Sequence, residues 1–166
     1  MKKQIFVAFL VIVVFFAVST ATAGDCRKVI AKLGPATYLD ECSYDGVDYL
    51  WCIDTPVTGN LRGTWHYLSS PEDNFWVLTV PDGALGIPSW TIWTVWNLSV
   101  FETHKGDIIT QDNEIINLDV FDTYGALSGM AFVIGGTGNY EGATGWLGYV
   151  VTEADGGELR GEVCTP

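Results

Sequence analysis

The residues best able to do chemistry in this chain are polar side chains set inside apolar runs. Asp119 lies between Leu118 and Val120. If it faces a dry interior, burial favours its protonated form and suits it to general acid–base catalysis. If it faces outward, it is one more solvated acid on an acidic chain. We take Asp119 as the candidate catalytic residue.

Aromatic side chains are the other chemical resource. The chain has seven tryptophans, and each offers a large apolar surface with one N–H donor, which suits a cavity that holds a hydrophobic ligand. The alternative is that they only fill the core or seal the ends of the fold. The candidate ligand-binding residues, chosen because they lie within strand-like runs, are Trp65, Tyr67, Trp93, Trp96, Asn97 and Asn117.

Other reaction types find little support. The chain has no G-x-S-x-G motif, which nucleophilic hydrolases use. His66 is expected on the opposite side of its strand from its two aromatic neighbours, His104 is expected in a turn, and the cysteines are expected to be oxidised, so no zinc site is predicted. Four residues gather near one expected hairpin and are interpreted as a solvated rim rather than a calcium site, since they lack EF-hand spacing: Asp107, Asp112, Asn113 and Glu114.

The elements that must position these residues are short strands. Apolar, β-branched and aromatic runs alternate with turn residues, and no segment shows a sustained helical period. This pattern predicts an all-β fold, an antiparallel barrel or sandwich. The expected strands are 61–69, 74–80, 90–103, 106–110, 114–123, 127–135, 145–153 and 158–164, with a turn at 111–113 between two of them.

Residues 24–60 lack clean periodicity and are interpreted as an N-terminal extension packed on a barrel formed by residues 61–166. Within the 90–103 run both alternating faces carry large apolar groups. Such a strand is covered on both sides, or one side lines an apolar interior while the other packs under the extension.

The segment 132–145, FVIGGTGNYEGATG, is rich in glycine. A dinucleotide-binding loop requires G-x-G-x-x-G before a helix, but Glu141 occupies the third glycine position and a strand pattern follows. A P-loop would require a lysine that this segment lacks. The glycines instead indicate a corner where a curved strand leaves a barrel and the next one begins.

The stretch from Gly135 to Gly145, GGTGNYEGATG, resembles the signature hairpin of the allene oxide cyclase and dirigent-protein barrels. The resemblance implies an eight-stranded antiparallel barrel with a mostly apolar cavity. Members of these families bind hydrophobic small molecules and steer cyclisation or radical coupling without a metal or organic cofactor. The hairpin carries the fold and assigns no catalytic role to any residue here.

The first residues predict export. Lys2 and Lys3 precede an apolar run that ends at Ala21-Thr22-Ala23, as in a cleaved secretory signal, so residues 1–23 are set apart from the fold. Cleavage would move the formal charge from −12 to −14, because it removes two lysines and no acid. Such a chain repels phosphate backbones and anionic lipid, so no nucleic-acid partner and no stable membrane association are expected.

The four cysteines follow the expected signal, and an exported chain with an even number of them favours two disulfides. Three pairings are open. We expect Cys42–Cys52 and Cys26–Cys164 from economy of chain path.

The sequence therefore predicts a secreted or periplasmic barrel that binds a hydrophobic small molecule, with three functional alternatives. It could be a cofactor-independent isomerase or cyclase, a carrier of lipid or pigment without turnover, or an interaction protein with a solid core. A homo-oligomer is compatible with the large aromatic content.

Overall fold

The computed structural model describes residues 24–69, 74–80, 90–117, 126–152 and 154–166. The expected signal, residues 1–23, lies outside these ranges. Within them no helix is long and apolar enough to cross a lipid bilayer. The strands are β1 Asp25–Leu33, β2 Thr37–Tyr44, β3 Val47–Gly59, β4 Gly63–Ser69, β5 Asn74–Val80, β6 Trp90–Thr103, β7 Gly106–Asn117, β8 Ala126–Gly136, β9 Thr144–Thr152 and β10 Gly156–Thr165.

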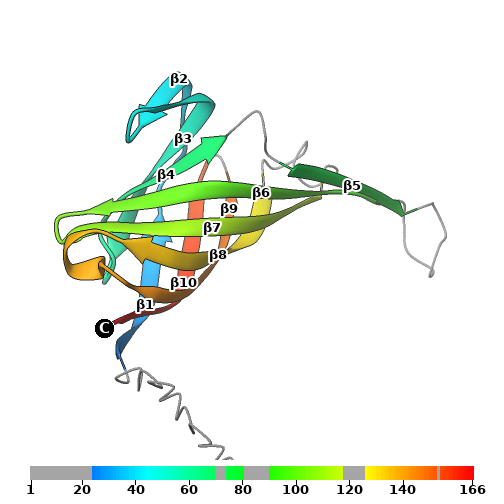
Figure 1. Cartoon of the computed structure of the whole chain (residues 1–166). Coiled ribbons are helices and arrows are strands. Elements are labelled where there is room, and N and C mark those ends of the chain that lie inside the picture. Colours follow the sequence, from blue (N-terminus) through cyan, green and yellow to red (C-terminus); the bar gives the residue numbers. More distant parts are fainter. Residues whose placement is uncertain (1–23, 70–73, 81–89, 118–125, 153) are drawn as a thin grey trace, which may run out of the picture.

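The strands form one antiparallel sheet that closes on itself (Figure 1). Neighbours follow the order β1-β10-β9-β8-β7-β6-β4-β3, and β3 then pairs with β1 through Ala31–Leu33 and Val57–Gly59. The result is a closed eight-stranded barrel, which confirms the predicted fold class. β2 pairs only with β3, and β5 only with β6, so both lie outside the closed wall.

The predicted boundary at residue 61 is not a boundary of the barrel. β1 and the second half of β3, both within residues 24–60, belong to the wall. β1 alternates between exposed residues and the buried Val29, Ala31 and Leu33. That period of two is the strand signal, and it was missed because the inward residues are few and small. Within residues 24–60, only β2 and the first part of β3 project from the wall (Figure 1).

A second prediction was wrong at residues 111–113. The structure has no turn there: β7 runs unbroken from Gly106 to Asn117, joining two runs that were assigned to separate strands. β6 pairs with it along this whole length. Asp and Asn favour turns, but continuous pairing on both sides of a strand overrides that preference.

The glycine-rich segment is a corner, as its sequence predicted. β8 ends at Gly136, one short 3-10 turn follows at Gly138–Tyr140, and β9 begins at Thr144. Gly138 has φ 56°, and a Cβ there would lie 2.6 Å from the Lys105 carbonyl oxygen. Asn139 N–H donates to that same carbonyl at 2.9 Å. Glycine is therefore needed at this point for its backbone angle and for the close approach to the β6–β7 turn.

From Leu98 to Phe101, β6 has an apolar layer on each side, as expected for that part of the 90–103 run; the side chains of residues 90–96 lie outside the described part. Phe101 belongs to the interior core with Trp65, Ile108 and Leu147. Val100 packs on the outer side with Cys52 and Leu68, and β2 contributes Cys42 and Tyr44 to this layer. The projecting β2–β3 hairpin thus covers the outer faces of β4 and β6.

Both predicted disulfides are present. Cys42–Cys52 lies within the β2–β3 hairpin, and Cys26–Cys164 joins paired positions on β1 and β10. Two disulfides are compatible with an extracellular or periplasmic location.

Candidate active site in the barrel interior

Two carboxylic acids lie inside the barrel on β7. Asp112 and Glu114 occupy alternate positions of the strand and are 0% and 1% exposed. The buried residues Ile108 and Thr110 precede them with the same spacing, so one face of β7 points inward along its length. The prediction that Asp112 and Glu114 belong to a solvated rim was wrong.

Asp112 is held by two hydroxyl groups. Ser99 Oγ donates to Asp112 Oδ2 at 2.6 Å, and Thr110 Oγ1 donates to Oδ1 at 2.7 Å. Burial raises the pKa of Asp112 from 3.8 to about 7, although both hydroxyl donors act to lower it. Near neutral pH this carboxyl group can therefore hold or release a proton.

Glu114 is held by two tyrosines from opposite parts of the wall. The Tyr67 hydroxyl, on β4, donates to Oε2 at 3.0 Å, and the Tyr149 hydroxyl, on β9, donates to Oε1 at 2.7 Å. Burial, followed by the nearby Glu114 charge, raises the pKa of Tyr149 well above 10. A Cβ on Gly129 would lie 2.5 Å from the Tyr149 hydroxyl oxygen, so glycine at this position makes room for the contact.

Two further polar side chains in the interior have unused hydrogen-bonding capacity. Asn97 on β6 pairs with Asp112 across the sheet, and neither its amide nitrogen nor its amide oxygen has a hydrogen-bond partner in the described part of the chain. The same holds for Trp65 Nε1. The Trp65 ring is stacked on the Phe101 ring, with the ring centroids 5.4 Å apart. It packs edge to face with the Tyr149 ring, with a centroid separation of 4.7 Å. Buried polar atoms usually have partners, so these groups mark the interior as a place where a polar atom can be bound.

The electrostatics of the cluster favour proton transfer. The buried polar residues of the described part are Thr55, Asn97, Ser99, Thr110, Asp112 and Glu114, and none is a cation. Two neighbouring carboxyl groups without a compensating positive charge resist ionising together. Asp112, whose pKa burial raises to about 7, is the member of this cluster suited to general acid–base catalysis near neutral pH.

The residues proposed from the sequence fall into two groups. Trp65, Tyr67 and Asn97 lie in the interior, around the two acids. Trp93, Trp96 and Asn117 have described backbones, paired with Ile116, Asn113 and Ile92, but their side chains lie outside the described part. Asp119 lies outside the described residues altogether. Sequence reasoning missed Asp112 and Glu114. The signal that could have found them is the alternation of inward positions that starts at Ile108 and Thr110 and continues to the two acids.

A separate cavity of about 560 Å³ opens at the end of the barrel near the β6–β7 turn. Ile108, Leu61 and Val163 are its buried apolar lining, and charged residues including Lys28 and Lys105 stand around it. Asp112 is four residues beyond Ile108 on β7, about 13 Å at strand spacing. This cavity therefore does not reach the acids.

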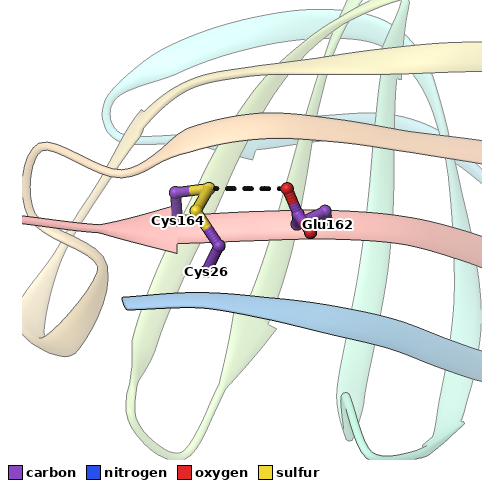
Figure 2. Close-up of side chains that lie close together, drawn as sticks. All are labelled: Cys26, Glu162 and Cys164. Carbon is purple, nitrogen blue, oxygen red and sulfur yellow. Dashed lines mark hydrogen bonds between the residues drawn. A yellow bond between two sulfur atoms is a disulfide. The ribbon is translucent and has the colours of Figure 1, made fainter. Parts of the chain in front are cut away.

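Two other groups of potential metal-binding or acid–base side chains lie on the outer surface, away from this site. His66 contacts Asp54 through Nδ1 at 2.8 Å and Glu102 through Nε2 at 3.1 Å, on the opposite face of β4 from Trp65 and Tyr67, as expected. Figure 2 shows the other cluster, in which Glu162 Oε1 lies 3.9 Å from Cys164 Sγ. Because Cys164 is bonded to Cys26, neither sulfur is a thiolate able to bind a metal.

Comparisons of this chain with protein-family models, with curated proteins and with solved structures return no match.

The tyrosines that hold Glu114 should be important for stability. Tyr149→Phe leaves one oxygen of a buried carboxyl group without its donor, and we expect the free energy of unfolding to fall by about 1–3 kcal/mol. Tyr67→Phe should have a similar effect through the other oxygen. Tyr140→Phe, at a tyrosine of the short turn between β8 and β9 and away from the two acids, is the control and should change the value by less than about 0.5 kcal/mol. Urea unfolding of the three variants measures these differences, and equal losses in all three would contradict the assignment.

Proposed function

We propose that the barrel binds a small hydrophobic molecule with an oxygen-bearing group, and that it catalyses a cofactor-independent isomerisation or cyclisation. The observation that supports this most is the pair of buried acids, Asp112 and Glu114, in an interior without a cation among its described residues. An acid whose pKa lies near 7 is suited to proton transfer at neutral pH.

In the proposed reaction Asp112 is the catalytic residue. Its carboxyl group donates a proton to the ligand oxygen and its carboxylate later accepts a proton from carbon, so the protein ends as it began and no electron acceptor is required. The amide of Asn97 and the Trp65 N–H hold the ligand oxygen in place, which uses their free hydrogen-bonding capacity. Glu114 is fixed in the same interior by the hydroxyls of Tyr67 and Tyr149.

The hairpin from Gly135 to Gly145 adds support. Its resemblance to the allene oxide cyclase and dirigent-protein barrels suggests membership of that group, where hydrophobic ligands are bound without cofactors. The two disulfides and the apolar N-terminal run support the further proposal that the chain is secreted or periplasmic.

The test uses the purified protein, the Asp112→Asn variant and a surface control, Glu102→Gln. Each is incubated with apolar lipid and terpenoid extracts, and the products are identified by mass spectrometry. The proposal expects a new product with the wild type and the control, and a loss of at least about 100-fold in rate with Asp112→Asn. A ligand that is retained unchanged by the wild type would instead establish a carrier.

The second candidate is an interaction protein with a solid core, which the aromatic packing favours. Trp65 packs against both Phe101 and Tyr149, and all three belong to the interior core. This candidate would be established if tryptophan fluorescence does not change with any apolar probe, no product forms and no ligand is retained. The same result would refute both ligand-binding functions.

A further inference from the structure

Large apolar side chains are exposed on the outer side of β7, β8 and β9, three strands that adjoin one another in the sheet (Figure 1). Six large side chains there are 42% to 62% exposed: Ile115, Met130, Phe132, Ile134, Trp146 and Val150. We call this surface the β7–β9 face. At its centre Phe132 and Trp146 are direct partners across the two strands, and the Trp146 ring extends over Gly148.

This face is also free of charge, which distinguishes it from the surfaces beside it. The outward positions from Ile109 to Ile115, from Ser128 to Ile134 and from Thr144 to Thr152 hold no acidic or basic residue, although the chain carries a formal charge of −12. The outward positions of β10 and β1 beside it hold charged residues: Glu158, Arg160, Glu162, Lys28 and Lys32. Depletion of charge with enrichment of aromatic residues and methionine is the composition of an interface core.

We propose that the β7–β9 face is the interface of a homodimer, in which the same face of a second copy covers it. The six side chains expose on the order of 500 Å² together, and the polar positions between and around them bring the area toward the roughly 800 Å² per partner of a stable dimer. A twofold axis through the centre would place the apolar residues of one copy on those of the other.

Charge favours a second copy over other partners. Two strongly acidic chains repel each other over most approaches, and the neutral face is where they meet with the least repulsion. A lipid surface fits poorly, because the face has no lysine or arginine to contact phosphate groups. This interface is independent of the interior acids, so it can hold or fail without the proposed function.

The experiment compares the wild type with Phe132→Glu and with Ile30→Glu by sedimentation equilibrium and light scattering. Ile30 is a matched control, because it is an outward apolar residue on β1, 63% exposed and outside the face. We expect a mass of two copies for the wild type and for Ile30→Glu. In Phe132→Glu the dissociation constant should rise roughly 30-fold or more, as for a residue at the centre of an interface.

Circular dichroism verifies folding, and Trp146→Ser serves as a second variant if Phe132→Glu does not fold. A monomeric wild type at the highest concentration reached would overturn the proposal, as would a mass other than two copies. So would equal dissociation by Ile30→Glu, or a wild-type monomer that floats with phosphatidylcholine vesicles and loses this binding in Phe132→Glu.

Discussion

Asp112→Asn should abolish a large part of the pH dependence of stability. The native pKa of about 7 lies above the ordinary 3.8, so the folded chain keeps its proton between these values while the unfolded chain releases it. Stability contributed by Asp112 is therefore complete below about pH 4, falls as the pH rises through 7, and is constant above it. The difference amounts to about 4 kcal/mol, an order-of-magnitude value.

Asparagine has nearly the same shape and cannot ionise. Its amide oxygen accepts from one of the two hydroxyls, of Ser99 and Thr110, and its amide N–H donates to the other. Urea unfolding at intervals from pH 4 to pH 8 should show the wild type losing stability relative to Asp112→Asn, with the variant the more stable of the two at pH 8. Asp155→Asn, at an exposed turn position, is the control and should follow the wild-type profile. Parallel profiles for all three proteins would mean that Asp112 is ionised in the native state throughout.

Removing the Cys26–Cys164 disulfide should cost the most stability of any single change considered for this barrel. The bond spans 138 residues of sequence, against 10 for Cys42–Cys52. In the chain-entropy model the loss is about 5 kcal/mol for the long loop and about 3 kcal/mol for the short one. The Cys26–Cys164 bond contributes more to stability because closing a longer loop removes more conformational entropy from the unfolded chain.

The measurement is urea unfolding of two double variants, Cys26→Ser with Cys164→Ser and Cys42→Ser with Cys52→Ser. The first should lose about 2 kcal/mol more than the second. The second pair is the internal control for the loss of a sulfur–sulfur bond as such. A larger loss from the β2–β3 hairpin would show that the packing of Cys52 against Leu68 and Val100 outweighs loop entropy.

Much of the fold could be predicted from local sequence. The turn chemistry around Gly138 predicted the corner between β8 and β9, and chain economy predicted both disulfides. The interior acids could not be predicted in the same way. Asp112 and Glu114 accept hydrogen bonds from the hydroxyls of Ser99, Tyr67 and Tyr149, which come from three other strands. A local window presents them as turn or rim residues. The alternation that begins at Ile108 and Thr110 reaches them only if the strand continues through residues 111–113, and the pairing of β7 on both sides is what keeps it a strand there.

The β1–β10 pairing matters for the timing of folding. Asp25 faces Thr165 at one end of a ladder of nine residue pairs, so β1 finds this partner only in the last strand of the barrel, while its other pairing, with β3, has three residue pairs. At about 5–20 residues per second, a ribosome needs on the order of 10 s to extend the chain from one to the other. The barrel therefore cannot close until β10 has been made, and for that interval β1 can be held only by its short pairing with β3.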